Sequence, residues 1–192
     1  MMNYKSRRGL IIILSLCAGT LMNMAFTDEL EKRKLYITKL TYEYNNRAFA
    51  YISMEKAARA HQGSASGEFY QAYYELEVKN RAIYTHMLSE LAFEHKVGWF
   101  THLRGKALGF YLSMTGGSPK MLIDIINPYI SELQKLRELS DPEHSEFFDY
   151  VVDQETAQLH ASKLAQLEGW QKGAEALRNF TRNTNIVLGE RV

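Results

Sequence analysis

Apolar side chains recur at steps of three and four residues along most of the chain, which is the pattern of amphipathic α-helices. After residue 27 the pattern divides into helical segments at 28–61, 68–95, 97–114, 119–139 and 142–177. Only 3 prolines occur in the 192 residues, and this scarcity favours helices over a turn-rich β fold. The sequence therefore predicts an all-α protein.

Short polar stretches separate these segments. Residues 62–67 are rich in glycine and serine and predict a turn between two antiparallel helices. Ser118 is placed to cap the helix that follows it, with Pro119 in the first turn. Residues 140–143 predict both a turn and the cap of the last helix, 142–177, which is the longest uninterrupted pattern after residue 27.

The N-terminal pattern differs from the rest. Lys5, Arg7 and Arg8 precede an apolar run at 9–26, and the chain turns polar at Thr27. This order is typical of a secretory signal or an N-terminal membrane anchor, and cleaved and anchored forms both stay open. It predicts a periplasmic or other extracytoplasmic location.

The domain limits follow from this order. We expect a signal or anchor at 1–26, a helical bundle at 27–180 and a tail at 181–192. Residues 6–11 resemble a twin-arginine export signal, and the alternative is the ordinary pair of basic residues before an apolar export segment.

Composition and charge exclude several classes of function. Lys and Arg total 23 against 22 Asp and Glu, so the balance gives no electrostatic footprint for nucleic acid. No zinc-finger, P-loop or nucleotide-binding glycine motif occurs, and no nucleophile motif indicates a hydrolase. The single cysteine, Cys17, lies in the N-terminal apolar run, so the body cannot form an internal disulfide.

The segment 97–114 is apolar and aromatic, but its charged residues argue against a membrane span. It predicts an amphipathic helix in which Gly98, Gly105 and Gly109 allow close helix packing. One interpretation is a core helix. The other is a surface for a membrane or protein partner, formed by the aromatic residues Trp99, Phe100, Phe110 and Tyr111.

Carboxylates lie on or beside the apolar stripes of four helices. In the last helix Glu155 falls about 20° from Phe148 at 100° per residue, and a lone acid facing a core is costly unless it is paired or bound to metal. Asn80 lies at the centre of its stripe next to Glu77, where an interhelical hydrogen bond would fix the register. Glu43 is expected in solvent. The inward candidates are Glu55, Glu77, Glu132 and Glu155.

This layout resembles ferritin-like proteins, and in particular the demethoxyubiquinone hydroxylase branch. The resemblance rests on 103–115 followed by Gly116-Gly117, on the Asp-Pro-Glu-His run at 141–144, and on Asp153-Gln154-Glu155, and it covers roughly residues 70–167. It implies a ferritin-like antiparallel helical bundle.

In that family two helices each carry Glu-x-x-His and two others each contribute a glutamate, and together they hold two irons. The resemblance implies that Glu77 and Glu155 match the motif glutamates. Asn80 and Gln158 stand where the histidines belong, and both are poor iron ligands. This departure suggests a bundle that has lost its metal and kept its fold.

Two functions from different classes follow. The first is a non-catalytic bundle without a cofactor that binds a protein, lipid or apolar ligand. The second is a dimetal oxygenase acting on a quinone-like substrate, with iron or manganese held by the carboxylates Glu55, Glu77, Glu132 and Glu155. Four acids within reach of one another would favour the enzyme, whereas acids each paired with a lysine, arginine or tyrosine would favour the binding protein.

Overall fold

The computed structural model describes residues 4–184 of the 192, and side chains from residue 27 onward. The predicted export or anchor segment at 1–26 lies outside the residues whose side chains are described. The chain divides into two compact units, 1–38 and 39–192. In the first unit the described side chains are mostly exposed, and Lys32 forms an ion pair of 2.9 Å with Asp28.

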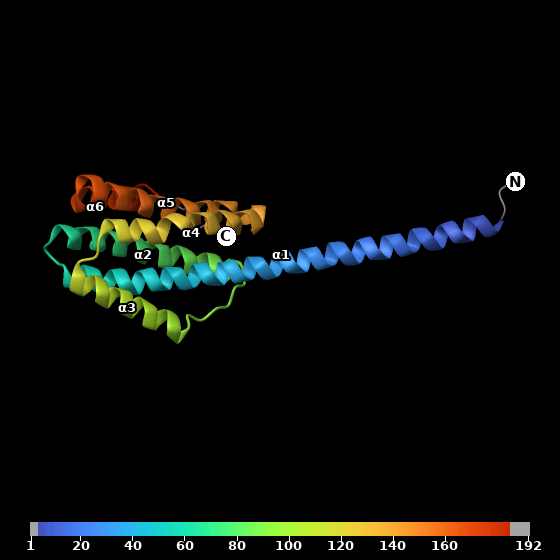
Figure 1. Cartoon of the computed structure of the whole chain (residues 1–192), viewed down its shortest axis with the longest axis horizontal. Helices are drawn as coiled ribbons and strands as arrows, with labels where there is room; N and C mark the ends of the chain where they lie inside the picture. Colours follow the sequence, from blue (N-terminus) through green and yellow to red (C-terminus); the bar gives the residue numbers. More distant parts are fainter. Residues whose placement is uncertain (1–3, 185–192) are drawn as a thin grey trace, which may run out of the picture. The chain divides into compact units, whose positions relative to one another are not determined.

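Six α-helices account for the described chain, which contains no strand, and this confirms the predicted all-α class (Figure 1). Among the described residues, no helix combines the length and the apolar character needed to cross a membrane. The helices are α1 (Tyr4–Ala60), α2 (Ala65–Glu90), α3 (Trp99–Thr115), α4 (Pro119–Leu139), α5 (Ser145–Glu168) and α6 (Trp170–Asn183), with a 3₁₀ turn η1 (Pro142–His144) before α5.

Side-chain caps fix several helix starts. Ser64 Oγ accepts a hydrogen bond of 3.0 Å from the Gly67 amide at the start of α2. Ser118 caps α4 through the Met121 amide at 3.2 Å, as the sequence predicts. These bonds satisfy amide groups that a helix leaves unpaired in its first turn, so the local sequence sets these boundaries.

The prediction of one helix over 142–177 is wrong. Gly169 has a φ of +100°, outside the helical region, and it separates α5 from α6. A Cβ at Gly173 would lie 2.6 Å from the Ala161 carbonyl oxygen, so α6 folds back closely onto α5. The helix also continues to Asn183, three residues beyond the expected end of the bundle.

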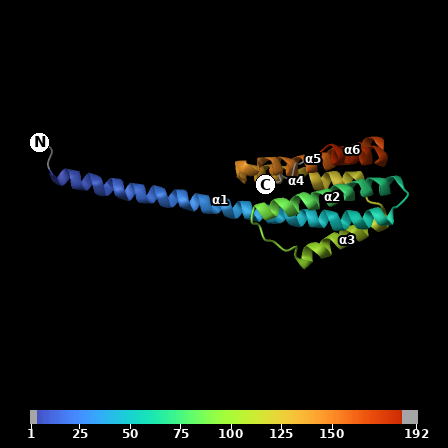
Figure 2. The ribbon, with the colours of Figure 1, turned by 180° about the vertical axis from the view of Figure 1, so that it is seen from behind.

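Within the second unit the helices form layers. Figures 1 and 2 show α5 and α6 on one side and α3 on the opposite side, with α2, α4 and the bundle portion of α1 between them. Helix α5 packs against both α4 and α6, and α6 also packs against α2. Helices α1, α2, α4 and α5 therefore enclose the centre of the bundle, where the polar bonds described below link all four.

Two glycines allow α3 to lie close to α1. A Cβ at Gly105 would be 3.1 Å from Ile52 Cβ, and one at Gly109 would be 3.0 Å from Lys56 Cβ. The small face of α3 thus packs on α1 through Gly105 and Gly109, as predicted. The prediction does not hold for Gly98, because it precedes α3 and a Cβ there would meet no described atom within 4 Å. The opposite face of α3 is exposed.

The interior of the bundle is layered along its length. On α5, for example, buried Phe147 and Phe148 are followed by buried Gln154, Glu155 and Gln158, and then by small and apolar residues from Leu159 onward. Helices α1 and α2 show the same order of apolar, polar and apolar buried positions, and half-buried Tyr129 of α4 lies between buried Ile126 and Leu133. A polar layer therefore lies between two apolar parts of the core, one of which includes Met54, Phe69, Leu76, Leu122, Ile126 and Leu159.

Candidate functional site

The polar layer is centred on Arg47, which is 5% exposed. Its Nη1 donates hydrogen bonds of 2.8 Å to Glu77 on α2 and to Gln154 on α5. Its Nη2 donates to Glu155 Oε2 at 2.5 Å. One guanidinium from α1 thus connects α1, α2 and α5 through charge-assisted bonds, which are stronger than neutral ones.

Glu43, one turn before Arg47, brings α4 into the same cluster. Its carboxylate accepts a hydrogen bond of 2.5 Å from the Tyr84 hydroxyl and another from the Tyr129 hydroxyl. Arg47 Nε lies 3.0 Å from Glu43 Oε1 and has no hydrogen-bond partner among the described atoms. We treat this contact as an ion pair, because Coulomb attraction depends on distance more than on angle.

Neutral amides complete the cluster. Gln158 donates to Glu77 at 2.9 Å and accepts from the Tyr73 hydroxyl at 2.5 Å. Asn80 donates to Glu77 at 3.2 Å and accepts from the Tyr150 hydroxyl. Asn80 and Gln158 are both fully buried, so the two positions at which the resemblance implies histidines hold hydrogen-bonded amides.

The cluster contains more acid than base. Arg47 supplies one positive charge against the carboxylates of Glu43, Glu77 and Glu155. Burial raises the pKa of Glu155 to about 7, although Arg47 acts in the opposite direction. Burial likewise raises the pKa of Glu77. Burial lowers the pKa of Arg47, but the three carboxylates outweigh it and hold that pKa well above its ordinary value. Arg47 is therefore permanently charged, while burial favours the protonated form of Glu155 and of Glu77 more than water does.

This donor set does not fit a pair of metal ions. Arg47 lies between the carboxylates that the resemblance assigns to metal, and a metal ion there would meet a guanidinium with no lone pair to offer. Within the described residues, no group of three or more histidine, cysteine, aspartate or glutamate side chains is arranged to hold a metal ion. The cluster joins helices by hydrogen bonds and ion pairs, and this is the interhelical role that the Glu77 and Asn80 spacing predicts.

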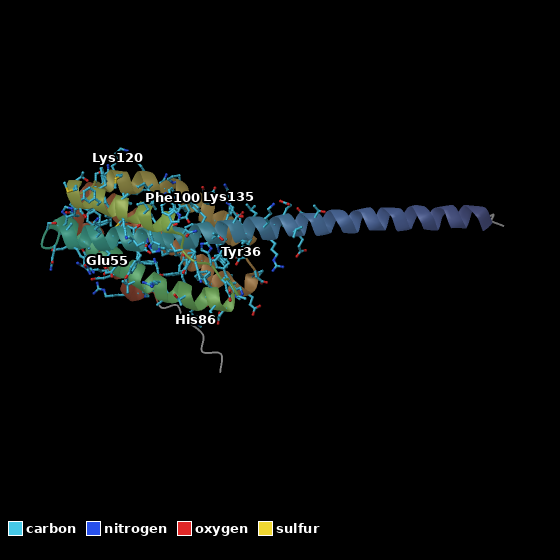
Figure 3. All side chains as sticks on the ribbon, turned by 90° about the horizontal axis from the view of Figure 1, so that it is seen from below. Tyr36, Glu55, His86, Phe100, Lys120 and Lys135 are labelled. Carbon is cyan, nitrogen blue, oxygen red and sulfur yellow. The ribbon has the colours of Figure 1, made fainter. Side chains whose placement is uncertain are left out.

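Two of the four candidate ligands lie elsewhere. Glu55 accepts a hydrogen bond of 2.7 Å from Arg59, one turn further along α1, and its side chain is 31% exposed. Glu132 binds Lys39 at 2.6 Å and Lys135 at 2.7 Å, and its side chain is 43% exposed. Figure 3 places Glu55 and Lys135 at separate positions along the bundle. Glu55 and Glu132 are each paired with a lysine or an arginine away from the polar layer. Of the four candidate ligands, only Glu77 and Glu155 come together.

The sequence interpretation missed Glu43 and Arg47. Glu43 was expected in solvent but is fully buried. The side of α1 that faces the core is not centred on the row of residues that contains Tyr44. The buried row includes Leu40, Ala50 and Met54, and Glu43 and Arg47 fall on it at helical spacing. An acid and an arginine four residues apart on such a row are the signal that could have identified them.

A pocket of about 330 Å³ lies over one side of the cluster. Its lining includes the buried residues Arg47 and Glu77 and the exposed residues Arg81 and His102. The pocket therefore runs from the surface to the polar layer. The remaining lining residues are Tyr44, Ala48, Tyr51, Ile52, Tyr84, Thr85 and Val97.

The outer face of α3 is a second candidate site, which we call the α3 outer face. Six of its large apolar side chains are exposed: Trp99, Phe100, Leu103, Phe110, Tyr111 and Met114. At 100° per residue around the helix axis, the mean direction of these six side chains is about 180° from that of Gly105. Lys106 lies at one edge of this face and Arg104 at the other. Helix α3 contains no acidic residue.

The polar layer, the pocket that reaches it and the α3 outer face thus all belong to one helical unit. Comparisons of the chain with protein-family models, with curated proteins and with solved structures gave no match.

Proposed function

We propose that this chain is an exported or membrane-anchored bundle of the ferritin-like type that acts without catalysis, by binding a lipid surface through the α3 outer face. The observation that carries the proposal is the arrangement of α3, with glycines inward, apolar side chains outward and basic side chains along both flanks. A helix of this kind lies in the plane of a membrane interface, with its apolar face among the acyl chains and its cations at the headgroups.

The chemistry of the exposed residues supports lipid over a protein partner. Trp99 is 75% exposed and Met114 is 71% exposed, which is unusual for side chains of their size on a soluble surface. Aromatic rings with a polar edge favour the headgroup region. The cations of Arg104 and Lys106, with no acid on the helix, favour anionic lipids.

The polar layer supports a non-catalytic role. Glu77 and Glu155 share Arg47, Glu55 pairs with Arg59, and Glu132 pairs with two lysines. Each acid has a cationic partner, as expected of a binding protein. The alternative of a dimetal oxygenase acting on a quinone-like substrate draws support only from the convergence of Glu77 and Glu155, and it would require Arg47 to leave its place between them.

The test uses Trp99 as a reporter. In the full chain with Trp170→Phe, Trp99 is the single tryptophan. After reconstitution into vesicles of phosphatidylcholine and phosphatidylglycerol, we expect its emission to shift to the blue and to be quenched by doxyl-labelled lipids. Quenching reports the depth of α3 itself, so the N-terminal segment does not obscure the result.

Charge reversal provides the control. Lys106→Glu should reduce the quenching in anionic vesicles, because each cation near such a surface contributes about 1 kcal/mol. Lys163→Glu makes the same charge change on an exposed position of α5 and should leave the quenching unaltered. Trp99 emission that is insensitive to vesicles and to doxyl lipid would refute binding through α3.

A further inference from the structure

Two exposed polar side chains, Arg81 and His102, line the mouth of the pocket over the polar layer. Arg81 packs its guanidinium over the Tyr51 ring at 5.3 Å. Within the described part of the chain, that guanidinium donates no hydrogen bond and forms no ion pair. His102, from α3, likewise bonds to no other described side chain, and it lines the same pocket. Arginine presents five donors in a planar fork that matches a carboxylate.

The charge balance at the floor of the pocket disfavours an anion there. Arg47 and Glu77 are bonded to each other at 2.8 Å, and Glu77 also accepts from Asn80 and Gln158. The cluster beneath has three carboxylates for one guanidinium, so a negative charge is disfavoured at depth and favoured at the mouth.

The walls between mouth and floor are apolar and aromatic. Tyr44, Tyr51 and Tyr84 contribute rings, and Ala48 and Ile52 contribute aliphatic surface from α1. At about 330 Å³ the pocket is at the lower end of the size range of small-molecule sites, which are mostly apolar with a few placed polar groups.

We infer that this pocket binds a small aromatic carboxylate, with its carboxylate held by Arg81 and His102 at the mouth and its ring against Tyr51, Ala48 and Ile52. This site does not require contact of the α3 outer face with lipid, so either proposal can fail while the other stands. The ligand is recognised by one negative charge and one flat apolar body.

The experiment is calorimetric titration of the full chain, in nanodiscs of zwitterionic lipid, with 2-naphthoate. Its neutral isostere 2-naphthamide has the same ring system without the charge. We expect saturable binding of naphthoate and binding of the amide that is weaker by about tenfold or more, since the charge-assisted bonds to Arg81 are lost.

Variants assign the binding to the pocket. Arg81→Gln should weaken naphthoate binding by about tenfold and leave the amide unchanged. Ala48→Trp should fill the pocket and abolish the binding of both. Arg59→Gln removes an exposed arginine of α1 outside the pocket and should change neither. Arg81 is exposed, so its substitution leaves the fold intact and the test does not depend on how Ala48→Trp folds.

Three results would overturn the inference: no saturable binding of naphthoate to the wild type, equal affinities for naphthoate and naphthamide, or an Arg81→Gln variant that binds like Arg59→Gln. Naphthoate binding that survives in a folded Ala48→Trp variant would likewise place the ligand elsewhere.

Discussion

Removing the Arg47 side chain would leave the carboxylates of Glu43, Glu77 and Glu155 in the core without a cation. Breaking a buried ion pair by deleting one partner costs about 3–5 kcal/mol. We therefore expect Arg47→Met to lower the free energy of unfolding by at least about 3 kcal/mol, measured by urea unfolding followed by circular dichroism. Arg59→Met, which breaks a surface pair, should change it by no more than about 0.5 kcal/mol.

The loss should be recoverable, because it comes from uncompensated charge. Adding Glu77→Gln and Glu155→Gln to Arg47→Met removes two of the three stranded carboxylates and should restore part of the stability. An Arg47→Met variant as stable as the wild type would contradict this role of the arginine. So would about two irons or manganese ions per wild-type chain, since such a site needs the space that Arg47 fills.

The sequence predicts some of the buried polar residues but not all of them. Periodicity identifies Glu77, Asn80 and Glu155 as inward, because apolar residues surround them at helical spacing. Glu43 shares its row on α1 with apolar residues, but its role as a buried acceptor depends on donors that other helices supply. The partners of Glu43, Tyr84 and Tyr129, lie 41 and 86 residues away in sequence.

At the scale of elements, the contact between α3 and α1 gives a direct prediction. Gly109→Leu would place a side chain where even a Cβ lies 3.0 Å from Lys56 Cβ, so α3 would have to move outward. Overpacking of this kind typically costs about 1–3 kcal/mol, which urea unfolding would detect.

The matched control is Ala107→Leu. Ala107 is exposed on α3, so the same final side chain should have little effect on stability there. If Gly109→Leu and Ala107→Leu were equally stable, the close approach of α3 to α1 through its glycine face would be wrong.

Helix boundaries that depend on local chemistry were predictable. Ser118 and Pro119 start α4 as expected, because a cap and a proline act within one turn. The break at Gly169 was not, since the apolar spacing from Phe148 to Leu177 continues across it. Only the return of α6 onto α2 and α5 requires the turn, and that packing is a long-range property of the fold.

At the scale of the whole molecule, the polar layer holds the helices together, and the two proposed binding sites lie on the bundle that it stabilises. The layer ties α1, α2, α4 and α5 together by bonds that cross the interior. Such a network specifies one arrangement of helices, since its donors and acceptors are satisfied together only in that register. The pocket and the α3 outer face then rest on a scaffold whose helices are fixed relative to one another.

The excess acid in the polar layer also makes the stability of the fold depend on pH. Burial raises the pKa of Glu155 to about 7, from 4.5 in an unperturbed chain, and Glu77 shifts in the same direction. Between these two values the folded protein binds more protons than the unfolded chain. The contribution of Glu155 to stability is therefore fully present below pH 4.5 and is lost as the pH rises through 7.

We accordingly expect the free energy of unfolding to fall between pH 5 and pH 8, by at most about 1.4 kcal/mol per pH unit for each proton involved. Urea unfolding at a series of pH values measures the slope. Glu155→Gln should flatten it, because the amide does not titrate. Glu132→Gln is the control: its surface lysines hold the pKa of Glu132 at about 2, so the carboxylate stays ionised across this range and its loss should not change the slope. A wild-type stability that rises from pH 5 to pH 8, or a slope that Glu155→Gln leaves intact, would mean that the arginine cluster holds its acids fully ionised.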